Sequence, residues 1–309
     1  MQVVISQLSS LSNSLSKNSA QFFENNQVPT TVNMAIFATY KSNEEAIEDV
    51  CHYIINNLSD IIQLPELFFI DDKTITNNAQ KLMQLNELCK QLITRISAEL
   101  RPFQYVCTSL VIDAKHQAVL ISERGVVATQ KQIQFCHRYP WTTLADTLNI
   151  VEVPLEQGTI KVAMLTGDDA SSTTIVDTAA FSHIHLLLVP FDIQTPCEVE
   201  NHLLSRAAER KICVAAASRE KSFTNEPSSG DSSNLKRHKN KQKIKQLKST
   251  GFIADSPLNV GLFTQNDVQE NNSANQLSVG QLIVKHQKGK ITKALVHPKA
   301  ACIYHQYGF

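Results

Sequence analysis

The segment KVAMLTGDD at residues 161–169 is a short apolar run that ends in a tight turn. A continuous apolar run of this length, closed by a glycine, is typical of a buried strand in an α/β protein. Gly167 lies in the turn, and Asp168 and Asp169 follow it. We expect these acids to accept backbone N–H groups, the common use of aspartate in turns, with paired catalytic carboxylates as the alternative.

Strands and helices alternate on both sides of this segment, and several neighbouring strands are joined by short polar turns. The expected strands are residues 32–38, 60–64, 105–112, 118–122, 150–153, 160–165, 184–189, 212–217 and 281–286, with a tail from Ala294 onward. Apolar residues at helical spacing predict helices over residues 42–58, 82–100, 174–181 and 198–210. This order predicts an α/β protein with a mixed sheet or two sheets packed face to face.

The composition indicates a protein with a large core and no net charge. Hydrophobic residues make up 42% of the 309 residues, and 29 basic residues balance 29 acidic ones. No apolar run approaches the roughly 20 residues that cross a bilayer, and the N-terminus lacks the regions of a secretory signal. The seven cysteines are unclustered, which indicates reduced thiols and a cytoplasmic protein.

The chain is expected to consist of an extension and one domain. Residues 1–30 predict an amphipathic or partly disordered extension, and residues 31–309 form the domain. Residues 218–250 interrupt that domain with turn-forming residues and with seven cations between Lys236 and Lys248. We interpret them as a disordered surface insert. Binding of nucleic acid or an anionic membrane is the less favoured reading, because the run has no aromatic residue for base stacking.

Four motifs in consistent order resemble the nitrilase superfamily, the carbon–nitrogen hydrolases. They are LPELF at residues 64–68, ISERGVVATQK at 121–131, VAMLTGDD at 162–169, and SRAAE at 205–209 followed by ICVAAA at 212–217. The similarity extends over about residues 32–309. The resemblance implies a four-layer α-β-β-α sandwich, in which two sheets lie between helical layers, and it implies a homodimer.

The resemblance also assigns roles at one site. Such hydrolases use a cysteine thiolate as nucleophile, a glutamate as general base and a lysine that stabilises the developing negative charge. Glu66 matches the base and Lys131 the cation, whereas Gly167 stands at the position of the nucleophile. Tyr139 stands where many members carry a second glutamate, and Asp168 replaces the aromatic residue beside the nucleophile. We therefore expect an inactive relative that binds a small amide-like or carboxylate ligand through Lys131, or acts through protein contacts.

An active hydrolase with a displaced nucleophile is the main alternative. Cys197 and Cys136 are the candidate thiols, although each is more easily explained as an ordinary buried or loop cysteine. No metal or cofactor is expected. His183 and His185 are two residues apart with no third ligand nearby, so a pair of structural histidines is favoured over a metal site.

Overall fold

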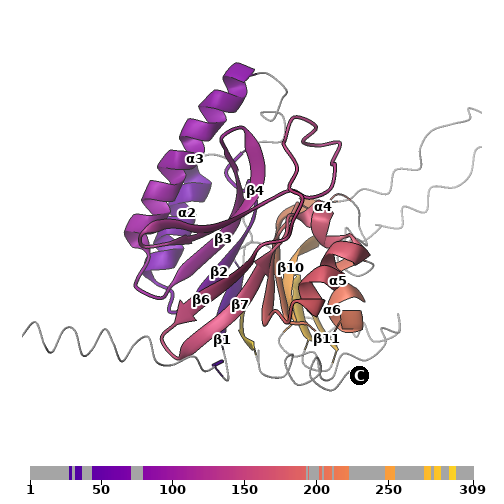
Figure 1. Ribbon diagram of the computed structural model, residues 1–309. Helices are drawn as coiled ribbons and strands as arrows, with labels where there is room; N and C mark the ends of the chain where they lie inside the picture. The colour runs from indigo at the N-terminus through magenta and orange to yellow at the C-terminus, as the bar shows by residue number, and fades with distance from the viewer. Residues whose placement is uncertain are drawn as a thin grey trace, which may run out of the picture.

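Two β-sheets packed face to face form the centre of the molecule, with helices on their outer sides (Figure 1). The computed structural model describes residues 28–29, 32–36, 44–70, 79–192, 194, 202–203, 205–210, 212–222, 248–254, 275–279, 282–286 and 292–296. This arrangement is the four-layer α-β-β-α sandwich that the sequence predicts. None of the helices in these residues is long and apolar enough to cross a membrane.

The first sheet has six strands in the order β13-β1-β2-β3-β4-β5. They are β13 (Thr292–Val296), β1 (Val32–Ile36), β2 (Ile61–Glu66), β3 (Tyr105–Ile112), β4 (Lys115–Ser122) and β5 (Gly125–Lys131). The neighbours β1, β2 and β3 run parallel, and the other pairs are antiparallel. The carboxyl ends of the parallel strands therefore lie at one end of the sheet, and Glu66 is the last residue of β2.

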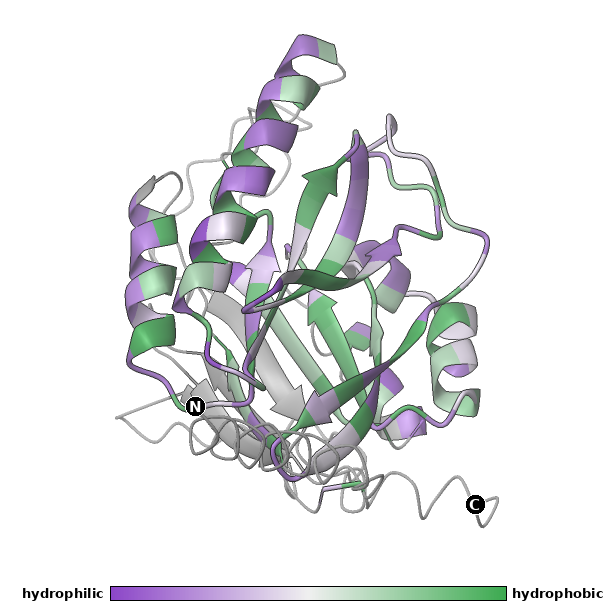
Figure 2. Cartoon of the chain, turned by 60° about the vertical axis from the view of Figure 1, so that its left-hand side comes forward, coloured by the Kyte–Doolittle hydropathy of each residue, from purple (hydrophilic) through white to green (hydrophobic). Residues whose placement is uncertain are grey.

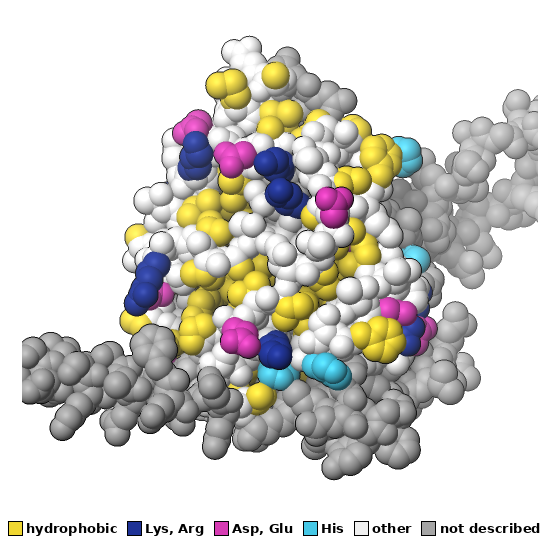
Figure 3. Space-filling view, in the orientation of Figure 1, with side chains coloured by type: hydrophobic (Ala, Val, Ile, Leu, Met, Phe, Trp, Pro, Cys, Tyr) yellow, Lys and Arg dark blue, Asp and Glu magenta, His cyan; other side chains and the backbone are white. Residues whose placement is uncertain are grey.

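The second sheet has seven strands in the order β11-β12-β10-β9-β8-β7-β6. They are β11 (Asn275–Val279), β12 (Leu282–His286), β10 (Lys248–Ala254), β9 (Val214–Ser222), β8 (Leu186–Pro190), β7 (Gly158–Met164) and β6 (Ile150–Leu155). Strands β7, β8 and β9 are parallel. In Figure 3, hydrophobic side chains gather at the centre of the viewed face, over β6 and β7 of Figure 1.

Helices cover the outer face of each sheet because alternate strand residues point to opposite faces. Helices α2 (Glu44–Ile55) and α3 (Ala79–Glu99) pack on the first sheet, where Ile62 and Leu64 of β2 face them. Helices α4 (Gly167–Ala170), α5 (Thr173–Phe181) and α6 (Ser205–Arg210) pack on the second sheet. Ile61, Val162 and other inward residues fill the space between the sheets. Figure 2 shows this apolar interior as green strands beneath helices with hydrophilic outer sides.

Most expected elements differ from the structure by a few residues at their ends, and two segments expected to lie outside strands are strand. Strand β9 continues five residues beyond 217 to Ser222 and pairs with β10 from Lys248, so both ends of the predicted insert are strand. Residues 294–296, expected to belong to a tail, lie in β13 and pair with β1. Hydrogen bonding between neighbouring strands explains both cases, since each segment gains a partner that is distant in sequence. The rest of the insert and residues 1–27 lie outside the described residues.

Candidate functional site

Polar side chains converge where the parallel strands of both sheets end. Glu66 ends β2, Thr166 and Gly167 follow β7, and Asp192 follows β8. The backbone N–H of Glu66 donates to the carbonyl of Phe191, 3.1 Å away, so these ends of the two sheets touch. Ligands of open α/β sheets commonly bind at the carboxyl ends of parallel strands. The geometry therefore marks this end as the candidate site.

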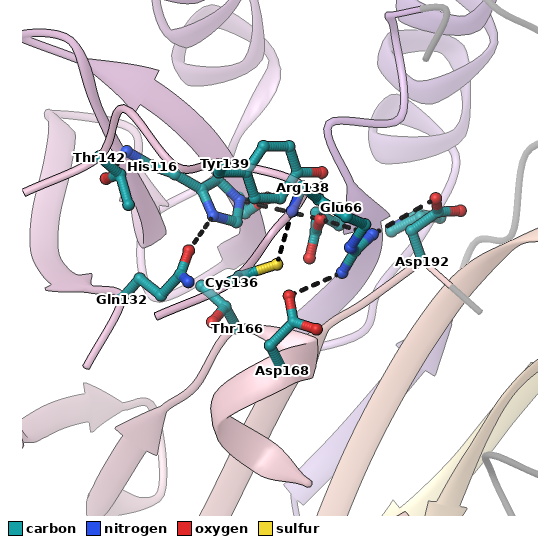
Figure 4. Close-up of polar contacts among 12 residues, drawn as sticks. Glu66, His116, Gln132, Cys136, Arg138, Tyr139, Thr142, Thr166, Asp168 and Asp192 are labelled. Atoms are coloured by element: carbon teal, nitrogen blue, oxygen red, sulfur yellow. Dashed lines mark hydrogen bonds and ion pairs between the residues drawn. The ribbon is translucent and has the colours of Figure 1, made fainter. Parts of the chain in front are cut away.

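Glu66 is buried and surrounded by polar side chains (Figure 4). The hydroxyl of Tyr139 donates a hydrogen bond to Glu66 Oε1 at 2.5 Å, and Arg138 Nη1 lies 3.3 Å from the same oxygen. His116 Nε2 is 4.0 Å from that oxygen. Glu66 is only 1% exposed, so its charge is compensated by protein groups rather than by water.

Arg138 joins three carboxylates. Besides Glu66, its guanidinium contacts Asp168 Oδ2 at 2.8 Å and Asp192 Oδ2 at 3.6 Å. Arg219 of β9 lies 3.2 Å from the same oxygen of Asp192. Burial lowers the pKa of Arg138. The neighbouring Glu66, Tyr139 and Asp168 raise it by more, so the pKa lies above its ordinary value. Arg138 is therefore a permanent cation that holds the cluster together.

His116 extends the cluster into the first sheet. Its Nε2 lies 3.0 Å from Ser109 Oγ and its Nδ1 3.2 Å from Gln132 Oε1, while its ring lies 4.2 Å from that of Tyr139. Burial lowers the pKa of His116, although Glu66 opposes this shift. The imidazole is accordingly neutral near pH 7, and both of its nitrogens have partners within the protein.

Gly167 lies against the backbone of the residue that follows β8. A Cβ atom built at Gly167 would lie 2.6 Å from Phe191 Cβ and 3.2 Å from Phe191 Cα. Real Cβ atoms do not approach so closely. The nearest atom, Phe191 Cβ, is bonded to the backbone and cannot move without it. Gly167 is absent from the residues with positive φ, so close packing is the reason for glycine here. A cysteine fits this position only after the chain at Phe191 has moved.

Asp169 fixes the loop that carries Arg138 and Tyr139. Its carboxylate accepts the backbone N–H groups of Ile133 and Gln134, each at 2.8 Å, and the hydroxyl of Thr166 at 3.1 Å. The expectation that an acid of this turn accepts backbone N–H groups is confirmed for Asp169. Burial raises the pKa of Asp169 to about 6, against the opposing effect of these hydrogen bonds. Asp169 thereby attaches the loop after β5 to the turn after β7.

Lys131 occupies a different place from the one expected beside Glu66. It pairs with Gln117 of β4 in the strand register, and its neighbours Gln130 and Gln132 are both buried. Gln132 points to His116, so strand alternation directs Lys131 to the opposite face of the sheet. Among the described residues, the cation beside Glu66 is Arg138.

The two candidate thiols have different outcomes. Cys136 lies in the cluster, where its sulfur accepts the backbone N–H of Arg138 at 3.3 Å. Burial raises the pKa of Cys136, and the adjacent Asp168 raises it further, so the thiol is protonated at neutral pH. Cys197 lies outside the described residues.

The histidine pair has a structural place. His183 lies in a turn with φ 55°, and His185 Nδ1 accepts the backbone N–H of Lys161 at 3.0 Å. Within the described residues there is no group of three His, Cys, Asp or Glu side chains that can hold a metal ion.

Arg138, His116, Asp192 and Arg219 are site residues that sequence reasoning missed. Arg138 directly precedes Tyr139, which stands where related hydrolases carry a second glutamate, so the neighbourhood of that position was the available signal. The other three lie in or beside strands, and only the packing of strands far apart in sequence brings them together.

Comparisons with known proteins identify relatives by structure alone. No protein-family model matches the chain, and no curated protein matches it in sequence. A carbon–nitrogen hydrolase from Helicobacter pylori G27 superposes with a TM-score of 0.62 at 13% identity, covering 91% of this chain and 94% of that one. An amidase from Nesterenkonia sp. AN1 superposes with a TM-score of 0.60 at 13% identity, covering 90% of this chain and 94% of that one.

That amidase structure is of a mutant with glutamine in place of a glutamate, and it carries the acetamide moiety of fluoroacetamide added covalently at the active-site cysteine. A glutamine-dependent NAD⁺ synthetase from Acinetobacter baumannii is also similar, with a TM-score of 0.58 at 11% identity. That match covers 86% of this chain and 45% of the synthetase. The chain therefore has the fold of the carbon–nitrogen hydrolases, and at these identities the likeness extends to the fold only.

Proposed function

We propose that this protein is a non-hydrolytic relative of the carbon–nitrogen hydrolases. The close approach of Phe191 to Gly167 carries this proposal, since it leaves no room for any side chain at the nucleophile position. Covalent hydrolysis by this fold needs a thiolate there, and glycine has no group that attacks a carbonyl or nitrile carbon.

The surroundings of Glu66 support the same conclusion. A general base must reach the proton it removes and must be free to accept it. Glu66 Oε1 instead accepts the hydroxyl of Tyr139 and faces Arg138, and Glu66 is sealed from solvent. A carboxylate oxygen that already accepts a tyrosine hydroxyl and faces a guanidinium is poorly placed to remove a proton from a nucleophile.

A second candidate function is the binding of a small primary amide without cleavage. Glu66 Oε2 and Arg138 Nη1 are buried and have no hydrogen-bond partner. One is an acceptor and the other a donor, which is the complement of an amide N–H₂ and C=O group. A ligand that enters when the hydrogen bond between Tyr139 and Glu66 opens would satisfy both atoms, whose burial without hydrogen bonds is otherwise unfavourable. In this proposal Arg138 takes the binding role that the sequence suggested for Lys131.

Turnover assays test the first proposal. Full-length protein is incubated with amides, nitriles and carbamoyl compounds, and release of ammonia is measured. We expect no turnover above a heat-denatured sample. Activity that disappears in Cys136→Ser and persists in Cys51→Ser, a matched buried thiol, would overturn the proposal and identify Cys136 as a displaced nucleophile.

Ligand-observed NMR tests the second candidate. Acetamide is compared with N,N-dimethylacetamide, which lacks the N–H donors. We expect binding of acetamide alone, lost in Glu66→Gln and retained in Arg124→Met, a control at an arginine whose side chain is 86% exposed. Equal signals from both compounds, or none from either, contradict the amide-binding role without affecting the first proposal.

Partners form the remaining part of the proposal. A homodimer is expected from the resemblance, and light scattering at several concentrations measures it; a monomer at all of them contradicts it. The cations from Lys236 to Lys245 lie outside the described residues and Lys248 begins β10, and binding of this run to polyanions is the less favoured role. Deletion of residues 233–248 should leave nucleic-acid and vesicle binding at low salt unchanged.

A further inference from the structure

A cavity of about 350 Å³ lies at the end of the sandwich opposite Glu66. Its lining residues lie at strand ends and turns: Pro29 and Asn33 at the start of β1, residues 58–60 before β2, residues 101–104 before β3, and residues 155–157 from the end of β6 to the turn before β7. Asp60 directly precedes β2, whereas Glu66 ends it, so the length of this strand separates the cavity from the Glu66 cluster. The volume falls within the range of small-molecule sites.

Carboxylates outnumber cations among the lining side chains. Asp60 and Glu156 are the acids, and Arg101 is the cation. The Arg101 guanidinium is directed to the carbonyl of Ile55, to which Nη2 donates at 2.7 Å. Burial raises the pKa of Asp60 and Glu156 raises it further, while the N–H of Asn33, 2.8 Å from Asp60 Oδ2, opposes the shift. The half-buried Asp60 and the exposed Glu156 therefore repel each other, and a bound cation would relieve that repulsion.

Apolar groups form the rest of the wall. Leu58 is 78% exposed although it is a large hydrophobic residue, and Pro102, Phe103 and Leu155 line the same space. An aromatic ring attracts a cation through its face, in addition to the apolar contact that it offers. Phe103 has φ 63°, an uncommon backbone conformation for a bulky residue, which shows that the surrounding chain holds this turn in place.

We propose that this cavity binds a small primary ammonium compound with an apolar body, of the arylalkylamine or alkylamine class. The ammonium group lies between Asp60 and Glu156, and the apolar body lies against Leu58, Phe103 and Leu155. A carboxylate or phosphate ligand is disfavoured by the two acids, and a neutral ligand gains nothing from them. This site is independent of the Glu66 cluster and of its catalytic state.

The test compares three compounds of similar shape and different charge. Calorimetry with full-length protein uses phenethylamine as the cation, phenethyl alcohol as the neutral compound and hydrocinnamate as the anion. We expect phenethylamine to bind with one site per chain, the alcohol to bind at least about threefold more weakly, and the anion not to bind. Equal binding of amine and alcohol, or no binding of the amine at millimolar concentration, overturns the proposal.

Matched variants locate the site. Glu156→Gln changes an exposed residue and should weaken phenethylamine binding about threefold to fivefold, the range for a partly exposed ion pair. Glu152→Gln, on β6 outside the cavity, is the control and should leave the affinity unchanged. Asp60→Asn should have a larger effect, but it also alters the contact with Asn33, so Glu156→Gln decides. Unchanged affinity in Glu156→Gln contradicts the proposed site.

Discussion

The hydroxyl of Tyr139 and the carboxylate of Glu66 are 2.5 Å apart in the interior of the molecule, although 73 positions separate them in sequence. This hydrogen bond occupies an oxygen of the glutamate that the resemblance assigns as the base. Arg138 Nη1 lies 3.3 Å from the same oxygen, so Glu66 belongs to a buried polar network in which most members have partners.

Removal of the Tyr139 hydroxyl should destabilise the protein more than an ordinary tyrosine-to-phenylalanine change. Tyr139→Phe leaves a buried carboxylate without its donor, at a cost of about 2 kcal/mol. Tyr105→Phe is the control, because that hydroxyl donates to the neutral carbonyl of Pro154 at 2.8 Å, and a loss of about 1 kcal/mol is expected. Urea unfolding measures both variants. Equal losses would show that Glu66 does not depend on this bond.

Arg138 should be among the most sensitive polar positions. Arg138→Met leaves Glu66, Asp168 and Asp192 without their shared cation, and loss of one partner of a buried ion pair costs about 3 kcal/mol or more. Arg124→Met removes an exposed contact with Glu123 and should change the free energy of unfolding by less than about 0.5 kcal/mol. Glu66→Gln added to Arg138→Met should recover part of the loss. Additive losses in the double variant would argue against a direct interaction.

Introduction of a thiol at position 167 should fail for steric reasons. Gly167→Cys and Gly167→Ala place a Cβ atom against Phe191, and overpacking of this kind costs about 1–3 kcal/mol. Both variants should lose similar stability in thermal unfolding, because the conflict lies at Cβ. Neither should release ammonia from amides. A stable Gly167→Cys variant with amidase activity would mean that the backbone at Phe191 shifts at little energetic cost, and it would contradict this prediction.

Asp169 should make stability depend on pH. Its pKa of about 6 lies above its ordinary value of 3.8, so the folded state binds the proton more tightly than the unfolded state does. Stability from this group is present at low pH and decreases as pH rises from about 4 to about 6, by up to about 3 kcal/mol. The difference in unfolding free energy between wild type and Asp169→Asn should fall over that interval. A difference that is constant or rises with pH contradicts the shift.

Cys136 should react slowly with alkylating agents. Burial and Asp168 raise the pKa of its thiol, and only the thiolate reacts with iodoacetamide. Peptide mapping should show slower modification at neutral pH in the folded protein than in urea, with the rate rising at alkaline pH. Faster modification in the folded state would indicate an activated thiol and would favour the displaced-nucleophile mechanism.

Local sequence patterns predict an α/β protein, and the resemblance adds the four-layer sandwich and part of the site. Strand β3 has the expected bounds, Tyr105–Ile112. A short apolar run between two turns is typical of a buried strand, so its ends could be predicted. Glu66, Gly167 and Tyr139 were found through the resemblance, and the structure places all three at the same end of the sandwich. These are positions where a short motif and a strand end coincide.

Arg138 and Lys131 show where sequence patterns stop being sufficient. The segment between β5 and β6 has no periodicity, and its path is fixed by Asp169, which lies 36 positions from Ile133. No local pattern reveals such a contact. Successive side chains of a strand point to opposite faces, so the direction of Lys131 depends on the register of β5. A register shift of one residue moves a side chain to the other face of the sheet. The motif predicts the strand that ends in Lys131. The face on which Lys131 lies follows from the contact of its neighbour Gln132 with His116.

The contact between Gly167 and Phe191 also has an evolutionary consequence. A codon change at position 167 alone yields a side chain that collides with the neighbouring backbone, so selection would act against it before any new chemistry could be tried. Two coordinated changes are needed, one that withdraws the chain at Phe191 and one that supplies sulfur. A single substitution at position 167 is thus an unfavourable route to a thiol at this turn.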